Sequence, residues 1–306
     1  MESLIVDCDP GVDDAIAIIL AHDLANLKGV TTVSGNVPLE ATTRNALQVI
    51  ALLDADIPVC KGAARPLKNP PVHSNHVHGF DGLGGVGLLE HTSSPSNVDA
   101  VDFLLETPTR NDWIVAIGPL TNLAHAIERD STWVNRIKGI SIMGGSTGYG
   151  NVTAAAEFNI YSDPEAAARV FESGARIRMC GLNLTHQFQV TEVFLRALAQ
   201  AEGDPAQFAE PMLRFLLGRM EELTGRRSAA LHDPCAVLAA THPQLFEFEN
   251  LSVRIELAGT LTRGMTVCDQ RTTRRRDSPN TEVAQSIDVG KAMPLLLNTL
   301  CKNERK

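Results

Sequence analysis

The alternation of strand-like and helix-like segments constrains the fold of this chain more than any other feature. Between the strand-like runs, stretches such as residues 12–24 and 38–53 carry apolar side chains at helical spacing. The strand-like runs are short and rich in Val, Ile and Thr, and they recur at residues 4–7, 29–34, near 59, 113–117, 137–143 and 176–180. Such alternation is typical of βαβ units. It predicts an α/β fold with a mostly parallel, doubly wound, Rossmann-like central sheet.

The remaining segments are less regular. Residues 62–97 are rich in Gly, Pro, Ser and His, which predicts a long loop of the kind that is often functional. Helical patterns dominate from about residue 191 to 240, residues 252–257 read as a late strand, and residues 289–301 as a closing helix. Because we find neither a linker nor an internal repeat, we expect residues 1–306 to form a single large domain.

Composition and charge exclude several classes of protein. The longest apolar run covers residues 15–21, far short of the roughly 20 residues of a membrane-spanning helix. A formal net charge of −9 argues against nucleic-acid and anionic-membrane partners, and the basic triplet at 274–276 is expected to be a solvated loop. The first residues lack the pattern of an export signal, so we expect a cytoplasmic protein. Six scattered cysteines without a CxxC pair are expected to be reduced thiols.

A dense group of carboxylates follows the first predicted strand. Asp7, Asp9, Asp13 and Asp14 lie within the segment DCDPGVDDA. Ligands of open α/β sheets bind at the carboxyl ends of the strands. Carboxylates this close repel one another, and a divalent cation relieves the repulsion, with oxygen ligands favouring Ca²⁺ or Mg²⁺ over zinc. The alternative is a capped helix start with solvated neighbours, but the number and position of the acids favour a site.

Seven sequence blocks, in order along the chain, resemble those of the nucleoside hydrolases, the inosine-uridine preferring nucleoside hydrolase family. DCDPGVDDA is similar to the signature DxDPGxDDA of that family. The other blocks are TTVSGN (31–36), HVHG (76–79), GPLTN (118–122), IMGG (142–145), AEFNIYSDPEAA (156–167) and HDPCAV (232–237). The resemblance implies an enzyme that uses water to cleave the N-glycosidic bond of a ribonucleoside, releasing free base and ribose.

The resemblance also implies a metal centre. In the family the cation is Ca²⁺, and the matching ligands here are the carboxylates of Asp9, Asp14 and Asp233 and the backbone carbonyl of Ile117. Asp9 would also act as the general base that takes a proton from the attacking water. Asp7 is expected to stabilise the ligands of this centre without binding the ion itself.

Substrate contacts follow from the same resemblance. Asp13 and Asn36 match residues that bind ribose hydroxyls, and Met143 matches a residue that lines the ribose pocket, although a core methionine is an equal alternative. His232 and His78 match histidines that approach the leaving base, whereas His73, His76 and His91 are expected to be loop histidines. The 3′- and 5′-hydroxyls are assigned to Asn151, Glu157 and Asn159, with Phe158 beside them.

Base preference and two other readings remain open. Family members that use purines well often carry tyrosines on the helix before HDPCAV, whereas residues 212–227 contain none. We therefore expect a preference for uridine and cytidine, with inosine as an alternative substrate. Arg226 or Arg227 could contact the base instead of a tyrosine. A haloacid-dehalogenase-type phosphatase with Asp7 as nucleophile would need a later Ser/Thr, Lys and acidic pair that fit poorly here. A non-catalytic nucleoside binder would be expected to lack Asp9, Asp14 or Asp233. The resemblance also implies a homodimer or homotetramer.

Overall fold

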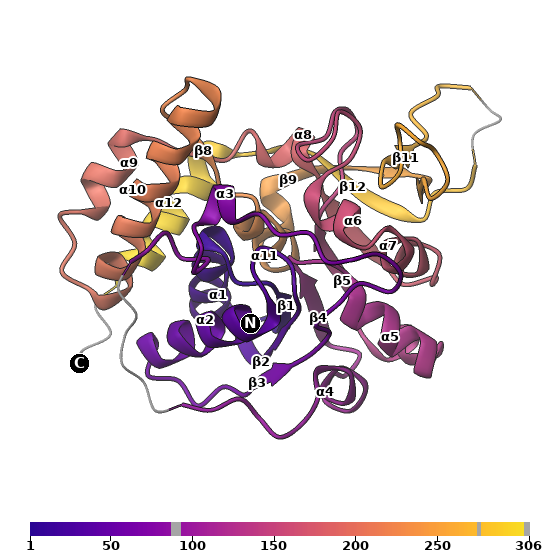
Figure 1. Ribbon diagram of the computed structural model, residues 1–306, viewed down its shortest axis with the longest axis horizontal. Helices are drawn as coiled ribbons and strands as arrows, with labels where there is room; N and C mark the ends of the chain where they lie inside the picture. Colours follow the sequence, from indigo (N-terminus) through magenta and orange to yellow (C-terminus); the bar gives the residue numbers. More distant parts are fainter. Residues whose placement is uncertain (87–92, 274–276, 303–306) are drawn as a thin grey trace.

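A central sheet with helices on both faces organises the protein, as a computed structural model describes it for residues 1–86, 93–273 and 277–302 (Figure 1). In the described part of the chain this sheet has eight strands in the order β3-β2-β1-β4-β5-β6-β12-β9. All neighbouring pairs are parallel except β12 and β9. The strands are β1 Ser3–Cys8, β2 Asn26–Thr32, β3 Val59–Lys61, β4 Asp112–Ala116, β5 Gly139–Met143, β6 Ile177–Cys180, β9 Phe246–Leu251 and β12 Thr281–Ile287. The α/β fold with a mostly parallel, doubly wound sheet is confirmed.

Helices connect the strands and cover the sheet. The longer ones are α1 Val12–Leu24, α2 Leu39–Leu52, α4 Ala100–Glu106, α5 Thr121–Arg129, α7 Pro164–Phe171, α9 Glu192–Leu198, α10 Asp204–Thr224, α11 Asp233–Thr241 and α12 Val289–Leu300. Short elements include α3 Asn75–His78, α6 Phe158–Ser162, α8 Leu182–Thr185, η1 Trp133–Arg136 and η2 Pro243–Leu245. No helix within the described ranges is long and apolar enough to cross a membrane.

Alternation along the strands divides the interior into two cores. Successive side chains of a strand point to opposite faces of the sheet. Leu4 and Val6 of β1 therefore pack into one core, which also holds residues of α1, α10, α11 and α12, while Ile5 packs into the other. That second core takes in α4, α5 and α7. Both faces of the sheet are thus buried, which explains why its strands read as continuous apolar runs rather than as alternating ones.

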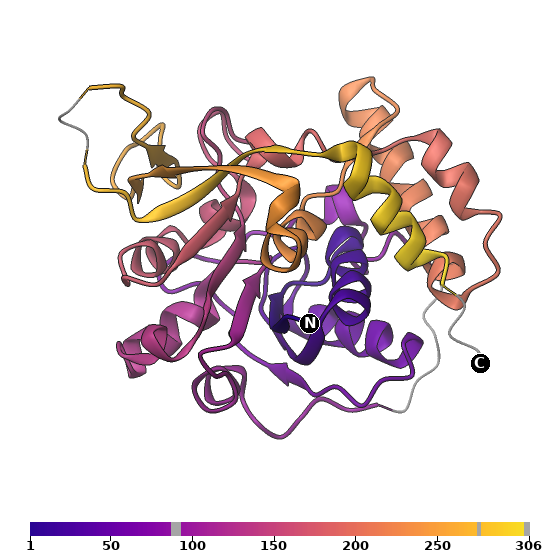
Figure 2. The ribbon, with the colours of Figure 1, turned by 180° about the vertical axis from the view of Figure 1, so that it is seen from behind.

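The last strands of the main sheet lie outside the runs that the sequence predicted. The late strand predicted at residues 252–257 does form, as β10 (Val253–Ile255), and it pairs with β11 (Thr266–Cys268) in a small separate sheet. The main sheet is instead completed by β12, parallel to β6, and by β9, which runs antiparallel at the edge (Figure 2). Another small antiparallel pair joins β7 (Gln189–Val190) to β8 (Ala229–Ala230).

The strand order fixes where a ligand site can form. The chain builds β1, β2 and β3 outward on one side and then returns to place β4 on the other side of β1. This reversal leaves a crevice at the carboxyl ends of β1 and β4, the usual ligand position in doubly wound sheets. The carboxylate cluster follows β1 directly, and Ile117 follows β4. His91 and the triplet 274–276 lie outside the described residues.

Candidate active site

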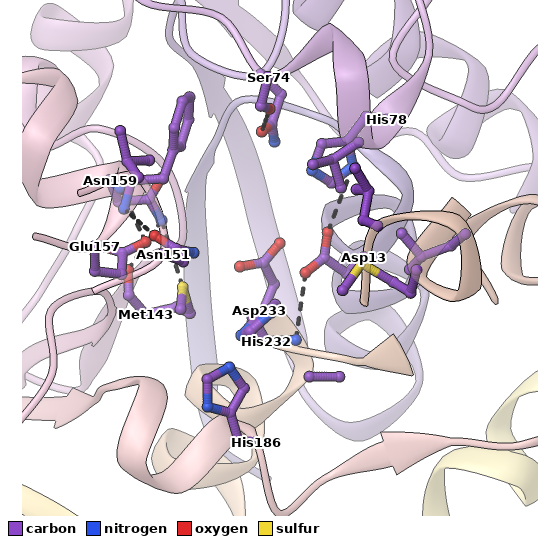
Figure 3. A pocket seen from close by; sticks show the side chains of 18 of the residues that line it. Asp13, Ser74, His78, Met143, Asn151, Glu157, Asn159, His186, His232 and Asp233 are labelled. Atoms are coloured by element: carbon purple, nitrogen blue, oxygen red, sulfur yellow. Dashed lines mark hydrogen bonds and ion pairs between the residues drawn. The ribbon is translucent and has the colours of Figure 1, made fainter. Parts of the chain in front are cut away.

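A cavity of about 870 Å³ opens at the carboxyl ends of the sheet strands. It brings together segments that are far apart in the sequence, from α1 to α11 (Figure 3). All predicted site residues line it except Asp9 and Asp14, which are fully buried beneath it. The lining members of the predicted set are Asp13, Asn36, His78, Ile117, Met143, Asn151, Glu157, Phe158, Asn159, His232 and Asp233.

Three buried carboxylates form the floor of the cavity. One oxygen each from Asp13, Asp14 and Asp233 lies within 4.8 Å of the others. Asp13 and Asp14 stand in the first turn of α1, whereas Asp233 opens α11. The two helices are held together here, since the backbone N–H of His232 donates to Asp13 Oδ2 at 3.3 Å. The floor therefore contains two of the predicted metal ligands and Asp13, which the sequence assigned to the sugar.

Asp9 lies directly after β1 and is clamped between two glycines. Its Oδ2 accepts the backbone N–H of Asn36 at 2.6 Å. A Cβ built on Gly35 would stand 2.0 Å from Asp9 Oδ2, and one on Gly118 would stand 2.6 Å from Asp9 Oδ1. Because only glycine leaves room for such a close approach, these two positions fix the orientation of the carboxylate. Asp9 is thereby placed beside the segment that follows β4, which includes Ile117.

Burial and mutual repulsion dominate the electrostatics of this floor. Desolvation is the main cause that raises the pKa of Asp14 to about 7 and the pKa values of Asp9 and Asp233 well above the usual range. The negative charges of neighbouring aspartates raise the three pKa values further. Carboxylates that repel in a dry site are stabilised by a bound cation.

The oxygens of the floor fit a hard divalent cation. Among the described residues, Asp9 Oδ1 and Asp13 Oδ1 are buried without a hydrogen-bond partner. A buried oxygen without a partner is costly, and coordination to a metal would satisfy both atoms. The donor set is oxygen only, which suits Ca²⁺ or Mg²⁺ rather than a transition metal. This site is where the chain could hold a metal ion.

Asn36 links the aspartates of the site by hydrogen bonds. Its side-chain N–H donates to Asp14 Oδ2 at 3.1 Å and to the Asp9 carbonyl at 3.2 Å. Its Oδ1 accepts from the Ser74 hydroxyl at 2.6 Å. Asp7 lies on the other side of the floor, where it accepts from Thr31 and Asn122 at 2.5 and 2.8 Å. Burial raises the pKa of Asp7 to about 7.

Glu157 and Asn159 build the wall opposite Asp13 and His78 (Figure 3). Glu157 caps the N-terminus of α6, where it accepts the backbone N–H groups of Asn159 and Ile160, and it also accepts that of Gly145. Burial nevertheless raises its pKa to about 7, because these hydrogen bonds offset only part of the desolvation. The Asn159 amide donates to the carbonyls of Ile117 at 2.8 Å and Met143 at 3.1 Å, so it joins the ends of β4 and β5.

Two further predicted residues complete this wall. Asn151 Oδ1 accepts the backbone N–H of Phe158 at 2.9 Å, which holds the loop before α6 against the start of that helix. The Met143 sulfur lies 3.5 Å from the Asn159 amide nitrogen and borders the cavity. The wall is therefore a set of polar groups that are already oriented by backbone contacts.

The two predicted catalytic histidines lie near Asp13. His78 Nδ1 accepts the backbone N–H of Val12 at 3.2 Å, so the proton of the neutral ring is on Nε2. The same Nδ1 lies 3.9 Å from Asp13 Oδ1. His232 Nδ1 lies 2.8 Å from the Thr185 hydroxyl. Burial lowers the pKa of both histidines, to about 4 for His232.

Several cavity residues escaped the sequence analysis. Ser74 and His76 line the cavity from α3 and the residue before it, although His76 was expected to be an ordinary loop histidine. Tyr149 and His186 also line it, and their rings stack with centroids 5.8 Å apart. The local sequence around His186 has no pattern that indicates a site, since only the fold brings it to His232.

The side of the cavity formed by α10 is aliphatic. Leu216, Met220 and Leu223 face it, which agrees with the absence of tyrosine from this helix. Aromatic side chains nevertheless border the cavity away from α10, because Tyr149 and Phe158 line it. Of the two arginines considered as base contacts, Arg226 lines the cavity, whereas Arg227 pairs with Glu192 and Glu221 at the surface. In that cluster Arg227 and Glu221 are exposed and Glu192 is half-buried.

Comparison with known proteins shows the family of this chain. The sequence profile of the inosine-uridine preferring nucleoside hydrolases matches residues 4–293. A pyrimidine-specific ribonucleoside hydrolase RihA from Shewanella baltica is 42% identical over 87% of this chain and 86% of its own length. A non-specific ribonucleoside hydrolase RihC from Salmonella agona is 39% identical over 94% of this chain and 93% of its own length.

Solved structures agree in fold. A plant nucleoside hydrolase, PpNRh1, superposes with a TM-score of 0.91 at 34% identity, covering 98% of this chain and 99% of that one. A purine-preferring ribonucleoside hydrolase from Gardnerella vaginalis superposes with a TM-score of 0.92 at 31% identity, covering 98% of both chains. The phosphatase reading is set aside by these matches. The chain belongs to the inosine-uridine preferring nucleoside hydrolase family, and it is an N-glycosyl hydrolase of the ribonucleoside hydrolase type.

Proposed function

We propose that this protein is a Ca²⁺-dependent hydrolase of pyrimidine ribonucleosides, with residues 1–306 acting as one nucleoside hydrolase domain. One observation carries the proposal: a floor of buried carboxylates with unpartnered oxygens faces a wall of oriented polar groups across one cavity. A ribose has hydroxyls for both sides. We assign Asp9, Asp14, Asp233 and the Ile117 carbonyl to the ion, and the proximity of Asp13 adds a fourth carboxylate to its surroundings.

The attacking water requires a base and a fixed position. Asp9 supplies the base in this proposal, because Asn36 holds its Oδ2 and its Oδ1, which has no hydrogen-bond partner, has one lone pair for the ion and another for a proton of the water. When bound, Ca²⁺ would make the water more acidic and neutralise the repulsion among the aspartates. Asn36 and the two flanking glycines keep the Asp9 carboxylate from turning away.

The sugar is held from two sides. Asp13 and Asn36 are assigned to the 2′- and 3′-hydroxyls, and Asn151, Glu157 and Asn159 to the 3′- and 5′-hydroxyls. Met143 and Phe158 border the ring of the ribose. Because polar groups built to bind hydroxyls are left unpaired by a substrate that lacks them, this arrangement also favours ribose over 2′-deoxyribose.

Departure of the base is assigned to the histidines. The neutral His78 ring carries its proton on Nε2, and His232 is neutral at pH 7 because burial lowers its pKa to about 4. Each can donate a hydrogen bond to the leaving base as negative charge develops on it. The electron pair of the glycosidic bond leaves with the base, which takes up a proton, and water adds at the anomeric carbon while Asp9 takes a proton from that water. The products are the free base and ribose.

The pyrimidine preference rests on two observations. The relative with 42% identity bears the name pyrimidine-specific ribonucleoside hydrolase, and α10 presents Leu216, Met220 and Leu223 where purine users of the family often place tyrosines. We also propose a cytoplasmic homodimer or homotetramer that acts on free nucleosides. Sedimentation of the purified protein tests the oligomeric state.

Ribose release from uridine, cytidine, inosine and adenosine tests the proposal directly. We expect chelator-sensitive release, fastest for the two pyrimidines and restored by Ca²⁺. Faster turnover of inosine than of uridine and cytidine would reject the base preference alone. No release from any of the four, with Ca²⁺ bound, would favour the non-catalytic nucleoside binder.

A further inference from the structure

Three rings, those of Tyr149, His186 and His232, form a row that lines the cavity. The Tyr149 ring stacks on His186 with centroids 5.8 Å apart and planes 20° apart. His186 in turn meets His232 edge to face, with centroids 5.8 Å apart and planes 68° apart. The row therefore runs from Tyr149, which is 67% exposed, to His232 beside the buried floor.

Polar contacts keep the three rings in order. The Tyr149 hydroxyl lies 3.3 Å from His186 Nδ1, and the Thr185 hydroxyl lies 2.8 Å from His232 Nδ1. His186 follows α8 directly, so both histidines are positioned by this one short helix. Partial burial lowers the pKa of His186, which disfavours the charged form of its ring.

The chemistry of this row differs from that of the opposite wall and of α10. Asn151, Glu157 and Asn159 present amides and a carboxylate beside the single ring of Phe158, and α10 presents aliphatic side chains. The row presents flat π surfaces, which bind flat heteroaromatic rings by stacking. Of the two halves of a nucleoside, only the base has such a ring. Tyr149 also has the exposed area that a bound base would cover.

We propose that Tyr149 and His186 form the wall against which the nucleobase lies, and that they are specificity-determining residues. This inference rests on the proposed function, because it places the base of the same nucleoside. Tyr149 supplies the stacking surface, and its hydroxyl orients the His186 ring. Since a purine offers two rings to this wall and a pyrimidine one, loss of Tyr149 weakens purines more.

Binding of the separate products tests the inference without relying on turnover. NMR titration of Ca²⁺-loaded protein with hypoxanthine, uracil and ribose gives three dissociation constants for each variant. For Tyr149→Ala and His186→Ala we expect the dissociation constant of hypoxanthine to rise about tenfold. The dissociation constant of uracil should rise by a smaller factor, and that of ribose should change by less than about twofold. Tyr149→Phe keeps the ring and should retain hypoxanthine affinity within about threefold. Leu261→Ala, at a position 86% exposed and outside the cavity lining, is the matched control.

The outcomes separate this inference from the proposed function. Equal weakening of ribose and base in Tyr149→Ala would mean a general disturbance of the cavity, and unchanged base affinity would mean that the base lies elsewhere. Either result overturns the inference while leaving ribose release by the wild-type protein intact. A wild-type protein that releases no ribose would instead overturn the proposed function, and base binding would still report on Tyr149.

Discussion

The inner and outer ends of the cavity are built in different ways. At the inner end, Asp9, Asn36 and Glu157 are buried and held by backbone N–H groups or by one another. At the outer end, Leu223 and Tyr149 are 48% and 67% exposed. The inner groups follow strand ends of a sheet that is covered on both faces, whereas the outer groups belong to α10 and to a loop.

In the proposed function this difference separates the reaction from base selectivity. Groups that hold an ion and a sugar in fixed geometry would gain from rigid support, because small displacements of such groups cost much of the rate. Groups that only contact the base could change without loss of the reaction. Relatives named pyrimidine-specific, non-specific and purine-preferring share the fold or much of the sequence with this chain. We therefore expect substitutions at the inner end to abolish turnover and those at the outer end to shift preference.

The largest effect is expected at Asp9. Asp9→Ala removes the proposed base and a proposed ion ligand together, so kcat/KM for uridine should fall by about 10³- to 10⁴-fold. Steady-state ribose release measures it. Asp102→Ala, on the exposed surface of α4 where Asp102 pairs with Arg129, should change kcat/KM by less than about twofold and is the control. Retention of a tenth of the activity would contradict the assignment of the general base to Asp9.

Glu157 should make stability depend on pH. Its pKa is raised from 4.5 to about 7 in the folded protein, so the folded state binds the extra proton between these values. The stabilising contribution of that proton is complete below pH 4.5 and is lost as pH rises through 7, a change of about 3 kcal/mol.

Urea unfolding of wild type and Glu157→Gln between pH 5 and 8 measures this effect. The free energy of unfolding of Glu157→Gln, relative to that of wild type, should increase as pH rises. Glu106→Gln, at the exposed end of α4, is the control and should show no such increase. A difference that is constant with pH would mean that Glu157 is ionised throughout this range.

Ca²⁺ should stabilise the folded protein. A ligand that binds only the native state at a hundred times its dissociation constant adds about 2.7 kcal/mol to the free energy of unfolding. Unfolding of chelator-treated protein with and without added Ca²⁺ measures the gain. Asp233→Asn should lose most of it, because it replaces one of the three clustered carboxylates of the floor with an amide. An unchanged unfolding midpoint in millimolar Ca²⁺ would refute an inner end organised around this ion.

The smallest effect is expected at the outer end. Leu223→Ala truncates a half-exposed side chain of α10 at the cavity, and the kcat/KM values for uridine and inosine should each change by less than about threefold. Their ratio is the sharper measurement, since only the ratio reports on selectivity. A loss as large as that of Asp9→Ala would erase the distinction between the two ends.

Much of the inner end could be predicted because its residues occur in local motifs. Asp9, Asp13 and Asp14 lie in one segment after β1, and Glu157 and Asn159 lie together in another. The parallel sheet then brings strand ends to one edge, as the alternation of segments predicted. That Asp13 joins Asp14 and Asp233 was not predicted, because sequence spacing does not show which side of a helix turn meets α11.

Other features depend on contacts that leave no local signal. β9 and β12 carry mixed side chains and become strands of the main sheet only by pairing. β12 pairs with β6, which is far away in the sequence, and β9 pairs with β12. Tyr149 and His186 approach each other from two different loops. No pattern within a single segment indicates these contacts, so the sequence does not predict them.

The junction of α1 and α11 makes the site a late product of synthesis. Asp13 and Asp14 leave the ribosome more than two hundred residues before Asp233, and the hydrogen bond from the His232 N–H to Asp13 can form only after that. A nascent chain therefore carries half of the proposed ion site. An ion bound by both halves would tie the first helix to a late one as a removable cross-link, and it could lock the chain only when synthesis is nearly complete.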